Sequence, residues 1–135
     1  TIRLALTAAE TGHLVFATLH TSSAAKTIDR IVGVFPGDEK SMVRTMLAES
    51  MCAIIAQTLI ASPKGGRVAA YEVLIATPAV RNLIRENKIA QLYSVMQTST
   101  QYGMQTLESN LQQLVGNGII SQDSLIRVSN NNAGI

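Results

Sequence analysis

The sequence predicts an α/β fold, and three observations support this. A short apolar run at residues 14–17 leads into hydroxyl residues and then a helical pattern, the order found at the carboxyl edge of an open α/β sheet. Two apolar segments, 54–60 and 67–75, flank a turn that contains Pro and Gly, as in a β-hairpin. Apolar residues recur at helical spacing over 77–127, so we expect strands within 1–76 and an all-helical part after them.

The first elements are expected to be a helix, a strand and a second helix. Residues 1–10 have a helical pattern and no capping residue before them, so we expect a helix that begins inside a longer chain. Residues 14–17 carry no charge and predict a strand buried on both faces, with Gly12 supplying a turn before it. Hydroxyl residues at 21–23 are good N-cap residues for a helix over 24–34.

The middle of the chain is expected to hold a helix and a hairpin. Residues 35–39 contain Pro and Gly, which end the previous helix, and acidic residues there favour the start of another. Residues 54–60 fit either a helix or a strand. The turn signal at 62–66 and the strand-like run at 67–75 favour the hairpin.

A helix should start at Thr77 and Pro78, because a capping residue followed by Pro at the first helical position is a strong start signal. The stretch 79–86 then carries an apolar stripe that we expect to be buried against a helix over 89–96. The stripe consists of Val80, Leu83 and Ile84.

The remaining helical residues are predicted from local signals. Arg81 and Arg85 lie one turn apart, and we expect both to project into solvent as ordinary surface residues. A helix over 104–115 should end at the glycines of 116–118, and Ser121 should cap a last helix that ends near residue 127. We expect the polar tail, 128–135, to be disordered.

Composition excludes several classes of function. Aromatic residues make up 4% of the chain and the net charge is +2 without a basic block, which argues against nucleic-acid binding. The chain has one cysteine and two histidines, which argues against a structural zinc site. No apolar run approaches the roughly 18 residues of a membrane span, and no signal peptide is visible, so we expect a cytosolic protein without membrane insertion.

His20 is the main candidate for chemistry from the pattern alone. It lies at the carboxyl end of the expected strand, beside hydroxyl residues and near a helix N-terminus, which favours anions such as phosphate. A histidine at a strand end is more often a hydrogen-bonded structural residue, so that alternative stays open. His13, before the strand, is a weaker candidate.

Two stretches resemble motifs of a known family. Residues 11–24 resemble the His box of the secretion ATPase superfamily, and residues 79–86, AVRNLIRE, are similar to a signature of the type IV pilus retraction ATPases. The resemblance covers nearly all of residues 1–127. It implies a RecA-like ATPase core followed by a helical C-terminal subdomain, within a homo-hexameric motor that hydrolyses ATP with Mg²⁺. The phosphate loop and catalytic glutamate of the family would then lie upstream of this chain.

The same resemblance implies roles for named residues. His20 and His13 correspond to catalytic His-box residues that sense the γ-phosphate, with Thr18 and His20 near the nucleotide. It also implies a cytoplasmic motor that is peripheral to the inner membrane and contacts an inner-membrane pilus platform protein. The motif implied in motor output consists of Arg81, Asn82, Leu83, Ile84, Arg85 and Glu86.

Other functions compete with this one. Type II secretion and pilus assembly ATPases typically carry a four-cysteine zinc motif, which Cys52 alone cannot supply. A non-enzymatic helical adaptor could bind a partner through Arg81 and Arg85, and a helix-turn-helix regulator ranks last because no basic recognition helix is present. The chain has no GxxxxGK[ST] phosphate loop, so we expect it to be inactive on its own and to hold no nucleotide.

Overall fold

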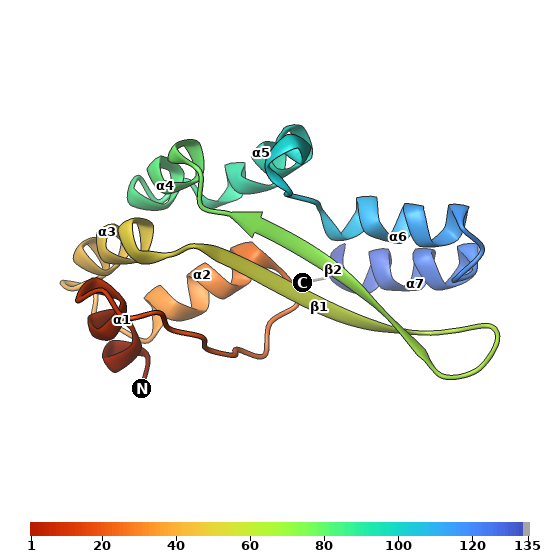
Figure 1. Cartoon of the computed structure of the whole chain (residues 1–135), viewed down its shortest axis with the longest axis horizontal. Coiled ribbons are helices and arrows are strands. Elements are labelled where there is room, and N and C mark those ends of the chain that lie inside the picture. The colour runs from red at the N-terminus through yellow and green to blue at the C-terminus, as the bar shows by residue number, and fades with distance from the viewer. Residues whose placement is uncertain (134–135) are drawn as a thin grey trace.

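A long antiparallel hairpin is the central element of the chain (Figure 1). The computed structural model describes the backbone of residues 1–133 and the side chains of residues 1–130. Within this part, α1 to α5 surround the end of the hairpin where its strands enter and leave, and α6 and α7 lie along the half nearer its turn (Figure 1). The elements are α1 (Ile2–Glu10), α2 (Ala24–Gly33), α3 (Lys40–Ser50), β1 (Ala53–Ala61), β2 (Arg67–Ile75), α4 (Pro78–Arg85), η1 (Ile89–Gln91), α5 (Leu92–Thr98), η2 (Thr100–Tyr102), α6 (Leu107–Gly116) and α7 (Gln122–Ala133).

The hairpin confirms the strand interpretation of residues 54–60 over the helical one. β1 and β2 pair in register from Ala53 opposite Ile75 to Ala61 opposite Arg67. Because side chains alternate across a strand, the even-numbered residues of both strands face the helices, and the odd-numbered residues face away. The face turned away exposes Ile55, Leu59 and Tyr71.

Two apolar clusters hold the helices against the hairpin. The larger one gathers residues of α1 to α5 around Leu74, and it includes Ile28, Val43, Ile84 and Leu92, which are all fully buried. The smaller cluster joins the other half of the hairpin to α6 and α7. Its buried members are Ile60, Ala70, Leu107, Leu111 and Ile120.

The predicted helix starts are confirmed by side-chain caps. The Ser23 hydroxyl accepts the backbone N–H of Lys26 at 3.1 Å, and the Thr77 hydroxyl accepts that of Val80 at 3.4 Å. Pro78 occupies the first turn of α4, as the sequence indicates. These local signals set where the chain enters α2 and α4.

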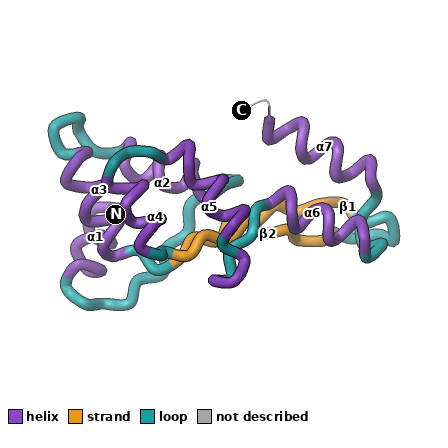
Figure 2. The backbone as a smooth tube through the Cα atoms, turned by 90° about the horizontal axis from the view of Figure 1, so that it is seen from above, coloured by secondary structure: helices purple, strands orange, loops and turns teal. Residues whose placement is uncertain are grey.

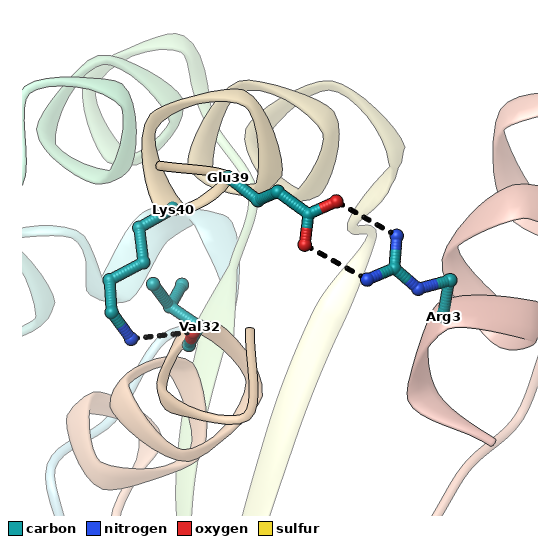
Figure 3. Close-up of polar contacts among 4 residues, drawn as sticks. All are labelled: Arg3, Val32, Glu39 and Lys40. Carbon is teal, nitrogen blue, oxygen red and sulfur yellow. Dashed lines mark hydrogen bonds and ion pairs between the residues drawn. The ribbon is translucent and has the colours of Figure 1, made fainter. Parts of the chain in front are cut away.

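An ion pair connects α1 to the start of α3, and a hydrogen bond from a lysine connects α3 to α2 (Figure 3). The Arg3 guanidinium donates two hydrogen bonds to the Glu39 carboxylate, at 3.3 and 3.0 Å, and lies 5.0 Å from the centre of the Phe35 ring. The Lys40 ammonium donates to the carbonyl oxygen of Val32 at 3.2 Å, in the last turn of α2. A cation is favourable there because the last carbonyls of a helix lack intrahelical partners.

The strand predicted at residues 14–17 is not present. Figure 1 shows residues 11–23 as an irregular connection between α1 and α2, and Leu14 and Phe16 are 78% and 88% exposed. A strand exists only through hydrogen bonds to a neighbour, and residues 14–17 have no such partner within the part of the chain described. The prediction that this run is buried on both faces is therefore wrong for this structure.

Two further expectations differ from the structure. The last helix, α7, does not end near residue 127 but continues to Ala133, so residues 128–133 are not a disordered tail; residues 134–135 lie outside the described range. Figure 2 shows α7 following α6 near the turn of the hairpin and running back from there at an angle to the strands. The predicted division between residues 76 and 77 stays a prediction, and the larger cluster contains residues from both sides of it.

Candidate functional site

His20 lies at the tip of a tight turn just before α2. The backbone N–H of Thr21 donates to the carbonyl oxygen of Leu19 at 3.0 Å, which closes a three-residue turn around His20. The His20 side chain is exposed, as is that of Thr18, and the ring makes no hydrogen bond to any residue that the structure describes. Both ring nitrogens are therefore available to a ligand or to another part of a larger protein.

His13 has a different environment, at the C-terminal end of α1. Its backbone N–H donates to the carbonyl oxygen of Ala8 at 3.0 Å, and that of Gly12 donates to Ala9 at 3.2 Å, with Gly12 at a φ of 98°. This pair of bonds, with glycine in the left-handed region, is the Schellman helix end. His13 thus completes the C-terminal cap of α1.

The His13 side chain takes part in the same cap. Its Nδ1 lies 3.2 Å from the Ala8 carbonyl oxygen and 3.2 Å from the Thr11 hydroxyl. A hydrogen bond to the Ala8 carbonyl oxygen places the proton on Nδ1, whereas a hydrogen bond donated by the Thr11 hydroxyl uses an unprotonated Nδ1, so the tautomer decides which contact forms. The two histidines are not hydrogen-bonded to each other. Of the two, only the His13 side chain forms hydrogen bonds to described residues, at the end of α1.

Glu72 is a buried polar residue that the sequence interpretation missed. It is 4% exposed on β2, and its Oε1 accepts the backbone N–H of Ala24 at 3.0 Å. Its Oε2 accepts the backbone N–H of Leu107 at 3.3 Å. Ala24 and Leu107 are the first residues of α2 and α6, so one carboxylate caps the N-termini of two helices.

A sequence signal for Glu72 did exist. Glu72 alternates with Ala70 and Leu74 on the face of β2 that packs against helices. A carboxylate on a buried face requires hydrogen-bond donors, and helix N-termini supply them. The pattern therefore indicates a partner, although it does not indicate which helices provide it.

Glu72 also changes the interpretation of the α2 N-terminus. The sequence predicts an anion-favouring helix start next to His20, suitable for phosphate. In the structure, the Glu72 carboxylate is the anion at that start, and the Ser23 hydroxyl takes the Lys26 N–H. Because these backbone N–H groups already have hydrogen-bond acceptors, they are not available to a phosphate as well. Among the predicted nucleotide contacts, only the exposed side chains of His20 and Thr18 are free of such partners in the described chain.

A hydroxyl pair connects the His20 turn to α2. The Thr21 and Thr27 hydroxyls are hydrogen-bonded to each other, and that of Thr27 also contacts the carbonyl oxygen of Ser23 at 2.9 Å. Thr27 is 6% exposed. The turn is therefore attached to the buried side of α2 and not only to its own chain neighbours.

The Arg81–Glu86 motif forms most of α4, and its residues separate into three groups. Val80 and Ile84 are fully buried, as predicted, whereas Leu83 is only half-buried at the edge of the same larger cluster. Asn82, Arg85 and Glu86 are exposed. Glu86 pairs with Lys88 at 3.2 Å on the surface.

Arg81 forms a group by itself, and the expectation that it projects freely into solvent is wrong. Its Nη1 donates to the backbone carbonyl oxygens of Ala48 and Glu49, at the C-terminal end of α3. The reason is non-local: α4 packs against α3, and the carbonyls at the end of α3 need donors.

A pocket of ≈ 280 Å³ opens beside Glu72, between α2, α5 and α6. Its wall includes Lys26 and Tyr93. The Tyr93 hydroxyl donates to Glu108 at 3.2 Å, and partial burial raises the pKa of Tyr93 above its usual value. The pocket carries no group of metal-ligating residues: no cluster of three or more His, Cys, Asp or Glu side chains is present among the described residues.

None of the helices within residues 1–133 combines the length and the apolar character needed to cross a bilayer.

Known proteins that are similar to this chain over most of its length belong to one family. Residues 1–64 match the family model described as type II/IV secretion system protein. The chain is 65% identical to the type IV pilus retraction ATPase PilT of Pseudomonas aeruginosa, over 92% of this chain and 36% of that protein. It is 61% identical to the twitching motility protein of Neisseria gonorrhoeae, over 97% of this chain and 35% of that protein.

A solved structure agrees with these matches. The crystal structure of the pilus retraction motor PilT with bound ADP superposes with a TM-score of 0.84 at 47% identity, and the match covers 93% of this chain and 35% of that one. The chain therefore spans about a third of the length of the relatives it matches. The predicted fold class, strands with a hairpin followed by helices, is confirmed by this superposition. Its sequence matches and its fold together show that the chain belongs to the pilus retraction ATPase family of the secretion ATPases.

Proposed function

We propose that this chain is the C-terminal part of a homo-hexameric ATPase that powers type IV pilus retraction and twitching motility. The observation that carries the proposal is the 65% identity to a pilus retraction ATPase over 92% of the chain. The matched relatives are about three times longer, and the GxxxxGK[ST] phosphate loop is absent from these 135 residues. ATP and Mg²⁺ would therefore be held chiefly by residues outside this chain.

Within this chain, His20 is the residue proposed to sense the nucleotide. It is exposed at a tight turn whose position is fixed by α2, and its ring nitrogens have no partner among the described residues. A free imidazole held in this way can donate a hydrogen bond to a phosphate oxygen. Thr18 is exposed on the same segment and is proposed as a second nucleotide contact.

His13 is retained as a proposed His-box residue with a narrower role. Its Nδ1 is engaged at the end of α1, which leaves Nε2 to face any partner. Arg85, Asn82 and Glu86 are proposed to form the motor output surface, toward another subunit or an inner-membrane platform protein. The motor would then work at the cytoplasmic side, peripheral to the inner membrane.

The competing functions are less well supported. The adaptor alternative depends on a surface made by Arg81 and Arg85. The Arg81 guanidinium instead donates hydrogen bonds to backbone carbonyl oxygens at the end of α3. Type II secretion and pilus assembly ATPases belong to the same superfamily. The identities of 65% and 61% to retraction proteins favour retraction.

The test is His20→Ala in the complete ATPase. We expect kcat to fall while the affinity for ATP changes little, because a residue that senses the γ-phosphate acts in the step where that phosphate departs. His20→Gln is the matched control, since its amide can still donate a hydrogen bond. A variant with normal turnover at saturation but weaker ATP binding would make His20 a binding residue instead.

A second test uses the isolated chain. Purified residues 1–135 should neither bind ATP tightly nor hydrolyse it, because the phosphate loop is not in this sequence. Measurable turnover by this chain that is abolished by His20→Ala would contradict the proposal.

A further inference from the structure

Glu72 is a buried ionisable residue without a role in the proposed motor. Its two carboxylate oxygens accept the first backbone N–H groups of α2 and of α6, at 3.0 and 3.3 Å. These helices come from opposite sides of the hairpin in sequence, 48 and 35 residues away from Glu72. One side chain therefore links two helix starts.

The position of Glu72 makes it the meeting point of the two apolar clusters. On its face of β2, Leu74 belongs to the larger cluster and Ala70 to the smaller one. The pocket beside it is lined by residues of both α2 and α6, so open space adjoins these two helix starts. The carboxylate thus connects two parts of the molecule that have separate cores.

Hydrogen bonds and short stretches of the covalent chain connect Glu72 to the turn that carries His20. The carboxylate accepts a hydrogen bond from the backbone N–H of Ala24, the first residue of α2. One turn into α2, the buried hydroxyl of Thr27 is bonded to that of Thr21. The backbone N–H of Thr21 closes the tight turn that carries His20.

We propose that Glu72 is a positioning residue for His20, and that it fixes the His20 turn relative to α6 by capping α2 and α6 with a single carboxylate. This inference rests on the proposed role of His20 in the motor. Helix N-termini attract a negative charge, and hydrogen bonds from backbone N–H groups to a carboxylate are stronger than neutral ones. A displacement of α6 would then be transmitted to the His20 turn through this side chain.

The substitution Glu72→Gln tests the link with little change of volume. A carboxylate accepts hydrogen bonds on both oxygens, whereas a carboxamide accepts on one atom and donates on the other. The variant can therefore accept only one of the two N–H groups, and it accepts that one more weakly because a carboxamide is neutral, so both helix starts are loosened. Thr106→Ala is the matched control, because Thr106 is a buried cap of α6 alone, accepting the N–H of Ser109 at 3.1 Å.

The first measurement is amide hydrogen exchange on the complete hexamer without nucleotide. We expect Glu72→Gln to speed exchange in residues 21–27, because the start of α2 loses its fixed partner. Thr106→Ala should speed exchange in α6 and leave residues 21–27 unchanged. Unchanged exchange of residues 21–27 in Glu72→Gln would overturn the proposal.

The second measurement is a double-mutant cycle with His20→Ala on ATP turnover. Glu72→Gln should lower kcat about tenfold to a hundredfold, the loss that misplacement of a catalytic group causes, with little change in KM. In the His20→Ala background it should cause no further loss, because residues that act through one another are not additive. Independent, additive losses would show that Glu72 is merely structural.

The cycle also separates the two hypotheses. If His20→Ala slows turnover and Glu72→Gln does not, the positioning role is wrong and the proposed function stands. If His20→Ala leaves turnover intact, the sensor role is wrong and so is positioning for it. Should Glu72→Gln fail to assemble, Glu72→Asp is measured instead, since its shorter side chain keeps the charge but cannot reach both N–H groups.

Discussion

Arg81 lies against the C-terminal end of α3, where its Nη1 is 3.0 Å from the backbone carbonyl oxygen of Glu49. The same nitrogen donates to the carbonyl oxygen of Ala48. The carbonyls at the end of a helix lack intrahelical partners, and a cation near them also interacts favourably with the helix dipole. The first arginine of the Arg81–Glu86 motif is therefore a cap that joins α4 to α3, whereas Arg85, one turn later, is exposed.

The two arginines should differ in their effect on stability. Arg81→Ala leaves two carbonyl oxygens without this donor and should lower the free energy of unfolding by about 1–2 kcal/mol. Arg85→Ala, the matched control on the same helix, should change it by less than about 0.5 kcal/mol. Thermal melting of both variants in the complete protein compares them. Equal melting temperatures would show that the Arg81 contacts contribute nothing measurable.

Arg85 provides the cleaner test of motor output. Because its side chain is exposed and makes no hydrogen bond or ion pair among the described residues, Arg85→Ala should leave the complete protein folded, with the proposed assembly and ATPase activity largely intact. We expect the variant to lose pilus retraction, which a twitching assay measures. A variant that still twitches normally would remove Arg85 from the proposed output surface. Arg81→Ala cannot decide this point, since lost stability would also stop retraction.

The two histidines should be separable by stability measurements. His13→Ala removes the Nδ1 contact with the Ala8 carbonyl oxygen, and should lower the free energy of unfolding by about 1 kcal/mol. The His20 side chain is exposed and makes no hydrogen bond within the described chain, so His20→Ala should change the free energy of unfolding by less than about 0.5 kcal/mol. Chemical denaturation decides between them, and a larger loss for His20 than for His13 would contradict the structure.

Gly12 gives an independent check on the end of α1. Its φ of 98° lies in the left-handed region, and a side chain added there meets no neighbouring atom, so backbone strain is the main effect. Gly12→Ala should therefore cost about 1–2 kcal/mol. Gly33→Ala is the control, because Gly33 has open space around it and no positive φ. Similar melting temperatures for the two variants would argue against the predicted strain.

The Arg3–Glu39 pair predicts a dependence of stability on acid. The hydrogen bonds from Arg3, more than its charge, hold the pKa of Glu39 below its usual value. A carboxyl group whose pKa is lower in the folded state stabilises that state at pH values above its unfolded pKa, about 4.3. This contribution disappears as the pH falls through the folded pKa. Melting between neutral and acid pH measures the loss, and Glu39→Gln should flatten the corresponding part of the profile. An unchanged profile in Glu39→Gln would show that the pair is not responsible.

The elements of this chain that the sequence predicts are those set by neighbouring residues. Ser23, Thr77 and Pro78 start helices because a cap acts within one turn of its own residue. The hairpin follows from a glycine turn between two runs of strand-forming residues, and the apolar stripe of α4 follows from helical spacing. The two motifs that identify the family are likewise contiguous in sequence, at 11–24 and 79–86.

Only the tertiary structure shows which distant groups meet. An apolar run such as 14–17 becomes a strand when another strand supplies its hydrogen bonds, and none does so in the part described. The partners of Glu72 and Arg81 lie 32 to 48 residues away in sequence, and they are backbone groups, which carry no side-chain signal of their own. Periodicity shows that Glu72 is on a buried face. The packing of α2 and α6 decides that their N-termini pair with its carboxylate, and the packing of α3 decides that its C-terminus pairs with the guanidinium of Arg81.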